Sequence, residues 1–231
     1  MSINTDIGRK YDFYKNLIVP RGCYFIVRLD GNCFSRFTER FERPFDVNFY
    51  RAMLHGIKKL MTEVTDIYRV HFHSDEISCY FKKESEWFNR RVEKITSITS
   101  GILSVAFSKY LDTEAHFDSR ILVTPTKEDI EEYEKDRRLN AFRGCVNSYS
   151  FYKLADIIGI KPATRFLESI TSKDRQDFLF MSFGVNVSKL PYWQRVGEFL
   201  EWKEYWREGY NPILKKKVMA IRRKIVIKEA I

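Results

Sequence analysis

Short apolar runs and helical repeats alternate along the first part of the chain. Residues 23–29 (CYFIVRL) are rich in β-branched and aromatic side chains and end at Asp30-Gly31, which predicts a buried strand followed by a turn. Asp46 is a potential N-cap, and the apolar residues after it recur at helical spacing. Residues 68–73 and 77–81 are typical of two strands joined by a tight turn at residues 74–76.

The pattern continues with a second helix and a fourth strand. Ser85 is the expected N-cap of a long helix with one apolar stripe, and residues 116–124 (HFDSRILVT) favour a strand. Thr126 and Asp129 fit a capping box for the next helix, whose acidic start and basic end suit the helix dipole. The expected stripe of the second helix is Phe88, Val92, Ile95, Ile98, Ile102 and Val105.

The resulting order, β-α-β-β-α-β, defines the expected fold class. It is an α+β fold with a ferredoxin-like split βαβ core, which is also the core of polymerase palm domains and nucleotidyl cyclases. Helices are expected at 141–158 and 163–171 and a strand at 178–187, before a basic C-terminal stretch. We therefore expect a palm-like catalytic core over 1–135 and a helical, basic C-terminal region over 136–231, packed on the same domain. The order alone supports a fold class and not a function.

Composition narrows the class of protein. The chain of 231 residues is 44% apolar and 16% aromatic, as in folded globular proteins. No apolar run approaches the ~20 residues that span a bilayer, and the N-terminus lacks the apolar segment of a secretory signal, so we expect a cytoplasmic protein without a membrane partner. The four cysteines show no CxxC spacing and the histidines no HExxH pattern. His71 and His73 would share one face of a strand, which alone is weak support for zinc.

The charge is positive and uneven. Lys and Arg number 40 against 31 Asp and Glu, and residues 215–231 hold seven basic residues and one acidic residue. Such a basic tail suits a polyanion such as nucleic acid, because phosphate contacts release counterions. A solvated surface face is the alternative interpretation.

Two acidic sites carry the candidate chemistry. In a split βαβ core, the end of the first strand and the turn of the hairpin lie at the same edge of the sheet, so Asp30 and Asp75 should meet. Adjacent carboxylates repel unless a cation lies between them, and Mg²⁺ prefers oxygen ligands. Gly31 allows a close backbone approach, so its carbonyl is a possible further ligand. Each site alone is also ordinary turn chemistry; together they favour a metal site.

Five ordered strings resemble the tRNA-His guanylyltransferase family. They are RLDGNCFSRF (28–37), RPFD (43–46), HSDEISCYF (73–81), EWFNRRVEK (86–94) and HFDSR (116–120), and the likeness continues through NVSKLPYWQRVG (186–197). The resemblance implies that two magnesium ions are held by Asp30, the Gly31 carbonyl and Asp75, with Asp30 and Asp75 as catalytic residues. It also implies that nucleotides, GTP or ATP, contact Asn32, Cys33, Phe34, Ser35, Arg43, Asp46, Ser74, Arg91 and Lys94.

The family resemblance implies growth of RNA at its 5′ end. The 3′-hydroxyl of an incoming nucleotide, usually GTP, attacks an activated 5′ phosphate of tRNA. Eukaryotic members carry an HINNLYN string linked to recognition of tRNA-His, which the stretch RRLNAFRGCVNSYSFY (137–152) lacks. The chain is thus more similar to the bacterial and archaeal guanylyltransferase-like proteins. This favours template-dependent 3′-to-5′ addition that repairs 5′-truncated tRNA, with addition of a G at position −1 of tRNA-His as a further possibility.

The partner and the assembly also follow from the resemblance. It implies a tRNA-binding enzyme that assembles as a homotetramer, a dimer of dimers. Two alternatives stay open: a nucleotide cyclase on the same palm core, and a tRNA-binding module without activity. The basic residues that we expect to contact tRNA are Arg137, Arg138, Arg143, Lys215, Lys216 and Arg222.

Overall fold

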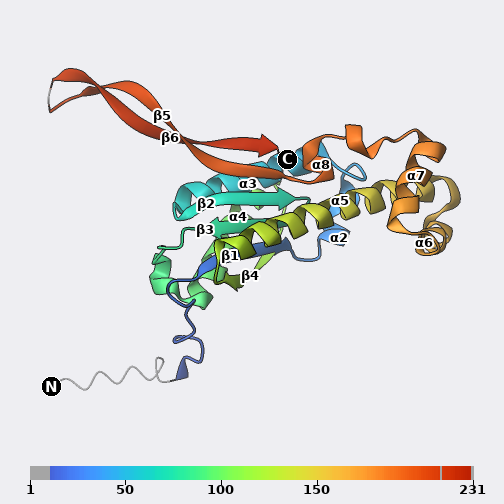
Figure 1. Cartoon of the computed structure of the whole chain (residues 1–231), viewed down its shortest axis with the longest axis horizontal. Helices are drawn as coiled ribbons and strands as arrows, with labels where there is room; N and C mark the ends of the chain where they lie inside the picture. Colours follow the sequence, from blue (N-terminus) through green and yellow to red (C-terminus); the bar gives the residue numbers. More distant parts are fainter. Residues whose placement is uncertain (1–10, 214, 230–231) are drawn as a thin grey trace.

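The computed structural model describes residues 11–213 and 215–229 (Figure 1). The first part of the chain has the expected β-α-β-β-α-β order, with a short helix, α2, after the first strand. The later part adds helices and two long strands. The elements of the first part are β1 (Tyr24–Gly31), α2 (Phe34–Phe37), η1 (Thr38–Arg40), α3 (Val47–Glu63), β2 (Ile67–His73), β3 (Glu76–Phe81), η2 (Trp87–Arg90), α4 (Val92–Leu111) and β4 (Phe117–Thr124). Those of the later part are α5 (Lys127–Ile158), α6 (Ile160–Glu168), α7 (Ser172–Phe183), η3 (Val187–Lys189), α8 (Tyr192–Arg195), β5 (Glu198–Asn211) and β6 (Lys216–Glu229).

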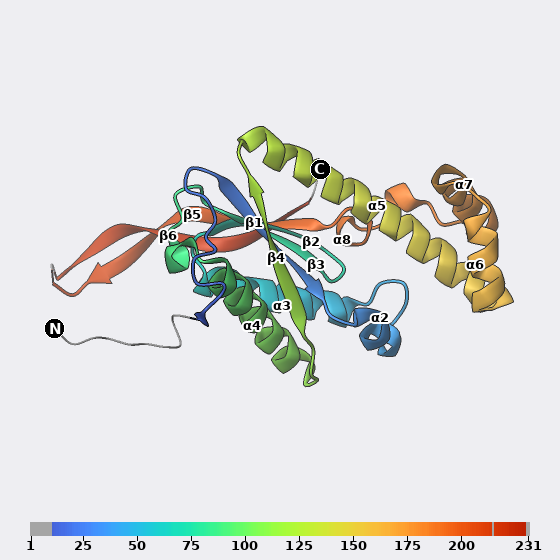
Figure 2. The same cartoon turned by 90° about the horizontal axis from the view of Figure 1, so that it is seen from below.

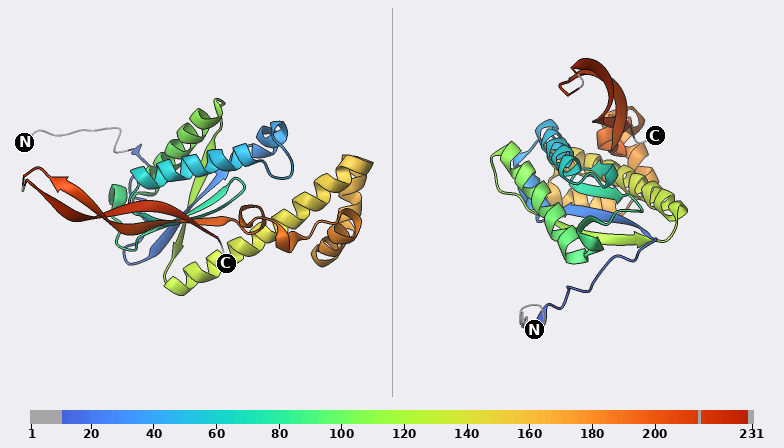
Figure 3. Two further views of the ribbon diagram at one scale, coloured as in Figure 1. Left: turned by 90° about the horizontal axis from the view of Figure 1, so that it is seen from above. Right: turned by 90° about the vertical axis from the view of Figure 1, so that its left-hand side faces the viewer.

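All strands join one antiparallel sheet of order β4-β1-β3-β2-β5-β6. Helices α3 and α4 cover one face, where the largest hydrophobic cluster lies, and α5 crosses the other face (Figures 2 and 3). Under α5, Ile130 and Tyr133 pack on Ile26, Tyr80 and Phe199. Two layers of helix on one sheet confirm the predicted α+β fold class.

The sequence predicted the start of α3 correctly. Asp46 is its N-cap, and one carboxylate oxygen accepts hydrogen bonds from the backbone N–H groups of Asn48 (2.6 Å) and Phe49 (2.8 Å). The predicted capping box of Thr126 and Asp129 is also present at α5. Both signals are local, and both determine the first turn of a helix regardless of what packs on it later.

Helix α4 begins later than predicted. Phe88, Asn89 and Arg90 have left-handed backbone conformations (φ 50°, 53° and 59°), so the helix starts at Val92, and Ser85 donates to the Asp66 carboxylate instead of capping it. The fully buried Arg90 holds this turn because its guanidinium saturates its five donors with carbonyl oxygens. These carbonyls belong to Val19 (3.0 Å), Lys83 (3.1 Å), Ser85 (2.9 Å), Pro20 (2.9 Å) and Cys23 (2.9 Å).

The predicted apolar stripe of α4 was also wrong in part. Ile98 and Val105 are 37% and 57% exposed, and Phe88 lies outside the helix. The buried face instead carries Ile95, Thr99, Leu103, Ala106 and Phe107. Thr99 is tolerated inside because its hydroxyl donates to the Ile95 carbonyl (2.7 Å).

Two further expectations need correction in the later part. The helix expected after the Thr126–Asp129 capping box and the helix expected at 141–158 are one helix, α5, of 32 residues, so the expected boundary at 135/136 falls within it. Residues 178–187 were expected as a strand, but α7 covers them as far as Phe183. A capping box of Thr171 and Asp174 starts this helix, and its apolar side chains pack against α5 and α6.

The basic C-terminal stretch, expected to be part of a helical region, is a β-hairpin. Strands β5 and β6 pair over their full length, and only the first residues of β5 pair with β2. The rest projects from the body as a twisted ribbon, at the end of the molecule away from α6 and α7 (Figure 1). Within the described residues, no helix is long and apolar enough to cross a membrane.

Candidate active site

The predicted meeting of Asp30 and Asp75 occurs at one edge of the sheet. Leu29 of β1 pairs with Ile77 of β3, so Asp30 lies beside the β2–β3 turn that contains Asp75. Ser74 begins this turn with a left-handed backbone conformation (φ 54°). Antiparallel register thus brings together two acids that are far apart in the chain.

Electrostatics show that these carboxylates are held under repulsion. Burial raises the pKa of Asp75, and the charge of Asp30 raises it further. Burial also raises the pKa of Asp30; the charges of Arg28 and Arg120 lower it, and those of Glu76 and Asp118 raise it. Neither Asp30 nor Asp75 forms an ion pair with a basic side chain in the described part of the chain. A cation would relieve this repulsion.

Asp118, within the HFDSR string, is an acidic neighbour of Asp30 that the sequence pattern did not predict as a site residue. It pairs with Asp30 across β1 and β4 and is exposed. The signal that could have located it is the antiparallel register of the first and fourth strands. Across residues 11–213 and 215–229, no three His, Cys, Asp or Glu side chains form a metal cluster. A site of two carboxylates and a backbone carbonyl suits Mg²⁺, which retains water and phosphate ligands, better than it suits zinc.

The two histidines of β2 have a structural role. Nε2 of His71 lies 2.9 Å from the Val196 carbonyl, and Nε2 of His73 lies 2.9 Å from the Gln194 carbonyl, so both rings donate to the segment around α8. Burial lowers the pKa of His71 to about 4, which keeps the ring neutral. Gly197 makes this approach possible, since a Cβ there would lie 2.4 Å from the Phe72 carbonyl oxygen.

The loop after Asp30 is held by the core. Phe34 is buried and stacks on Phe37, so its side chain anchors the loop and only its backbone can face a ligand. Gly31 is required here, because a Cβ at this position would lie 2.2 Å from the Phe34 ring. Asn32, Cys33 and Ser35 are exposed beside the carboxylates.

A cavity of about 160 Å³ opens beside the Asp75 turn. Three of the predicted nucleotide-binding residues line it: Arg43, Asp46 and Ser74. Arg43 lies over the ring of Tyr152 (4.9 Å). Both carboxylate oxygens of Asp46 already accept N–H groups from its own loop and helix, so this residue shapes the cavity. The remaining wall is mainly aromatic and includes Phe45, Tyr50 and Trp193.

Arg91 and Lys94 lie at the start of α4, outside the cavity. The preceding Arg90 binds the Cys23 carbonyl just before β1, so Arg91 lies toward the end of β1 opposite Asp30. Lys94 lies nearer to the carboxylates, because the Thr96 carbonyl accepts from Ser119, which pairs with Leu29.

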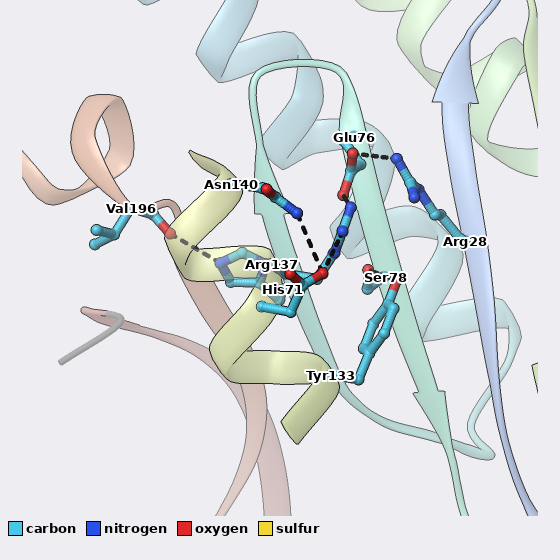
Figure 4. A network of polar contacts seen from close by, with 9 residues as sticks. Arg28, His71, Glu76, Ser78, Tyr133, Arg137, Asn140 and Val196 are labelled. Atoms are coloured by element: carbon cyan, nitrogen blue, oxygen red, sulfur yellow. Dashed lines mark hydrogen bonds and ion pairs between the residues drawn. The ribbon is translucent and has the colours of Figure 1, made fainter. Parts of the chain in front are cut away.

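The three predicted tRNA-binding arginines of α5 differ in exposure. Figure 4 shows Arg137 turned to the sheet, where Nη1 donates to Glu76 (2.9 Å), whose other oxygen accepts from Arg28. The Arg137 side chain is 12% exposed and this ion pair holds it against the sheet, while its RNA contact stays a prediction. Arg138 is partly buried and Arg143 is exposed. The other predicted tRNA-binding residues, Lys215, Lys216 and Arg222, are exposed on the ribbon or its turn.

An antiparallel palm-like sheet with two repelling carboxylates at one edge is typical of the nucleotidyl-transfer class of enzymes. Comparison with known proteins agrees with this class. A family model described as "Thg1: tRNAHis guanylyltransferase" matches residues 6–125, more than half of the chain. The chain therefore belongs to the tRNA-His guanylyltransferase family, whose members are nucleotidyltransferases.

The similar proteins extend beyond the matched segment. The probable tRNA(His) guanylyltransferase of Mus musculus is 27% identical over 84% of this chain and 71% of its own length. That of Drosophila melanogaster is 30% identical over 77% and 66%, so the chain spans about two thirds of these relatives. Among solved structures, the tRNA(His) guanylyltransferase of Saccharomyces cerevisiae superposes with a TM-score of 0.76 at 22% identity, covering 94% of this chain and 96% of that one. A bacterial Thg1-like protein in complex with GTP superposes with a TM-score of 0.74 at 23% identity, covering 97% and 91%. At these identities, the likeness to solved structures shows the fold.

Proposed function

We propose that this chain is a template-dependent 3′-to-5′ nucleotidyltransferase that adds nucleotides, preferentially GTP, to the 5′ end of tRNA in the cytoplasm. The observation that carries the proposal is the pair of Asp30 and Asp75, held together under repulsion at the edge of a palm-like sheet. Membership in the tRNA-His guanylyltransferase family supports the tRNA substrate. Repair of 5′-truncated tRNA is the main reaction we propose, with addition of G−1 to tRNA-His as a second one.

Asp30, Asp75 and the Gly31 carbonyl are the groups that would hold two Mg²⁺ ions. Such ions lower the pKa of an attacking hydroxyl and neutralise charge on a leaving pyrophosphate. The chain supplies the rigid frame: β1 holds Asp30 by paired strands on both sides, and the β2–β3 turn holds Asp75. In the absence of a cation, both side chains are under electrostatic strain, which an ion of charge +2 reverses.

The nucleotide would occupy the cavity and the loop beside the carboxylates. We assign the base to the aromatic cavity, where Tyr50 and Trp193 lie 4.6 Å apart between ring centroids. Arg43 at the rim and the exposed residues Asn32 and Ser35 can bind phosphate or ribose. Solved Thg1-like proteins in complex with ATP and with GTP support a site for either triphosphate.

The reaction forms one bond and breaks one bond at the 5′ phosphorus of the RNA. The 3′-hydroxyl oxygen of the incoming nucleotide attacks this phosphorus and loses its proton. The leaving group is pyrophosphate from a 5′-triphosphate end, or AMP from an end first activated with ATP. Protein residues position the nucleotide and the RNA end, which is the main protein contribution in phosphoryl transfer.

Arg91 and Lys94 lie outside the cavity that we assign to the base. The family resemblance implies a homotetramer built as a dimer of dimers. We propose that these two residues bind phosphate groups of nucleotide or RNA held by the tetramer. Their position at the uncapped start of α4 suits an anion.

One assay tests the proposed function. The protein is incubated with Mg²⁺, labelled GTP and a tRNA transcript that lacks its first nucleotide. Growth of the 5′ end with the nucleotide complementary to the template supports the proposal. A cyclic nucleotide formed without RNA would establish a cyclase instead. RNA binding without either product, unchanged in Asp30→Asn and Asp75→Asn, would leave a binding module.

The choice of tRNA needs a second substrate set. Because residues 137–152 lack the HINNLYN string, we expect restoration of a missing first nucleotide on several truncated tRNAs. The matched control is intact tRNA-His that lacks G−1. Exclusive use of this control would contradict the repair function while leaving the nucleotidyltransferase class intact.

A further inference from the structure

The β5–β6 ribbon has two faces of different chemistry. In an antiparallel pair, directly opposite residues project to the same side, and successive residues alternate between sides. The register pairs Lys203 with Lys224 and Glu204 with Arg223, so odd-numbered β5 positions share a face with even-numbered β6 positions. We call these the basic face and the mixed face of the ribbon.

The basic face carries five cationic side chains and no acidic one between residues 203 and 224. They are Lys203, Arg207, Lys216, Arg222 and Lys224. The mixed face over the same stretch holds two acids, two bases and a row of large apolar side chains. They are Glu204, Trp206, Glu208, Tyr210, Lys217, Met219, Ile221 and Arg223.

The cations of the two faces differ in their partners. On the mixed face, Lys217 pairs with Glu208 (2.9 Å) and Arg223 lies over the Trp202 ring (4.5 Å). On the basic face, Lys224 lies over the Tyr205 ring (5.6 Å). All five side chains of this face are exposed, and none forms an ion pair with a carboxylate of the described residues. The basic face therefore has unneutralised charge available to a ligand.

Like charges also face each other on the basic face. Lys203 and Lys224 are directly opposite, an arrangement that destabilises a two-stranded pair. Arg222 is diagonal to Lys203 and opposite Tyr205, so a further cation lies within reach. A bound polyanion would turn this repulsion into attraction, whereas a neutral or apolar partner would leave it in place.

The dimensions indicate an extended ligand away from the reacting end. From residue 203 to residue 211, a strand rises about 26 Å. Because β5 runs antiparallel to β2, with Glu198 opposite Phe72, the ribbon leaves the sheet at the end opposite the Asp75 turn. At the same rise per residue, Lys203 lies roughly 25 Å from that turn. A nucleotide in the Asp30–Asp75 site cannot reach so far.

We propose that the basic face of the ribbon docks the ribose-phosphate backbone of the RNA substrate at a segment distant from its 5′ end. This inference rests on the proposed function for the identity of the RNA, and it assigns the contact to one face. Lys203 and Arg207 join the contact, and Lys217 and Arg223 are excluded from it. Phosphate contacts of this kind position an RNA without reading its sequence.

Two double variants with equal charge loss test the assignment. Lys203→Gln/Arg222→Gln removes one lysine and one arginine from the basic face, and Lys217→Gln/Arg223→Gln removes the same pair from the mixed face. Binding of a 5′-truncated tRNA transcript is measured by filter binding over a salt series. For the basic-face variant we expect the slope of log K against log salt to fall by about 1.5, and affinity at 0.1 M salt to fall roughly thirtyfold. The mixed-face variant should retain the wild-type slope.

Further measurements separate the possible failures. The RNA concentration that gives half-maximal nucleotide addition should rise in the basic-face variant, because the substitutions weaken RNA binding. Lys203→Arg/Arg222→Lys should restore the salt slope, which shows that charge and not ribbon folding is responsible. If no RNA is extended by any protein, the proposed function fails, but the binding series still tests the ribbon. Equal loss in both double variants, no loss in either, or a changed sedimentation mass in the basic-face variant would overturn the inference; the last would assign the face to a second copy.

Discussion

The sheet beneath α5 and the β5–β6 ribbon are both rich in charge, but they use it differently. Beneath α5, Arg137 and Arg28 both donate to the carboxylate of Glu76. Near the start of β1, the buried Arg90 donates to five backbone carbonyls. On the ribbon, the cations of the basic face form no ion pair with a carboxylate of the described residues. Buried charges must be satisfied by the fold itself, whereas exposed charges remain available for a ligand.

The carboxylates of the candidate site fall between these two regimes. Asp30 and Asp75 are partly buried, like the charged side chains beneath α5. Like the cations of the basic face, however, they have no ion-pair partner of opposite charge among the described residues. A group that is fixed in position and left unneutralised is one prepared for a ligand. This comparison indicates which substitutions should affect catalysis, which stability and which binding.

The largest expected effect is loss of activity in Asp75→Asn. Loss of one metal-binding carboxylate removes several kcal/mol of charge stabilisation, so kcat should fall roughly a thousandfold or more. Without a cation, the variant should be at least as stable as the wild type, because repulsion with Asp30 is gone. The checks are single-turnover addition to truncated tRNA and the shift of Tm with Mg²⁺, which the variant should lose. The matched control is Asp118→Asn, for which we expect less than about a tenfold change; equal loss in both would contradict the assignment.

Arg90→Lys tests a buried arginine whose side-chain donors are all hydrogen-bonded. Lysine offers three donors where arginine offers five, so at least two carbonyls lose their partner and the left-handed turn loses its support. We expect the free energy of unfolding to fall by about 3 kcal/mol or more in urea titrations. The exposed Arg21, which pairs with Glu86, gives the control: Arg21→Lys should change stability by less than about 0.5 kcal/mol. Similar values for the two variants would remove the distinction between buried and exposed cations.

The buried His71 gives the molecule a defined acid sensitivity. Burial lowers its pKa to about 4 in the folded protein, below the ordinary value near 6.5, so in this window the unfolded chain binds a proton that the folded chain does not. Its contribution to stability is complete above about pH 6.5 and is lost as the pH falls through about 4, a loss of about 3 kcal/mol. Urea titrations at several pH values should show a flatter pH dependence for His71→Gln than for the wild type. His55→Gln, at an exposed position, is the control; parallel curves for wild type and His71→Gln would contradict the account.

The smallest expected effects compare two arginines of α5. Arg137→Gln should lower stability by about 1–3 kcal/mol, because it leaves Glu76 with one fewer partner, and should leave the salt slope of RNA binding unchanged. The exposed Arg143→Gln should do the reverse, with stability within about 0.5 kcal/mol and the slope lower by about 0.9 if it contacts phosphate. Thermal unfolding and filter binding measure both. The reverse result would show that Arg137 leaves its ion pair to bind RNA.

The core of the fold could be predicted from the sequence because its signals are local or periodic. Asp46 and the Thr126–Asp129 box start their helices through hydrogen bonds within four residues, and the apolar runs of β1, β2 and β3 define strands. The order of these elements placed Asp30 beside Asp75, since antiparallel pairing leaves few arrangements of a split βαβ core. The start of α4 could not be predicted, because it depends on carbonyls of residues 19–23 that Arg90 binds from about 70 positions away.

The sequence by itself thus determined the order of the core elements, the acidic pair and the family. Tertiary structure decided where the other charges went. It turned Arg137 into an internal ion pair, placed Arg91 and Lys94 outside the cavity beside Asp75, and made the basic tail a two-faced ribbon. The physical reason is that a charge has no fixed role in the chain. Whether it is buried or exposed, and which groups neutralise it, depends on strand register and helix packing between distant segments.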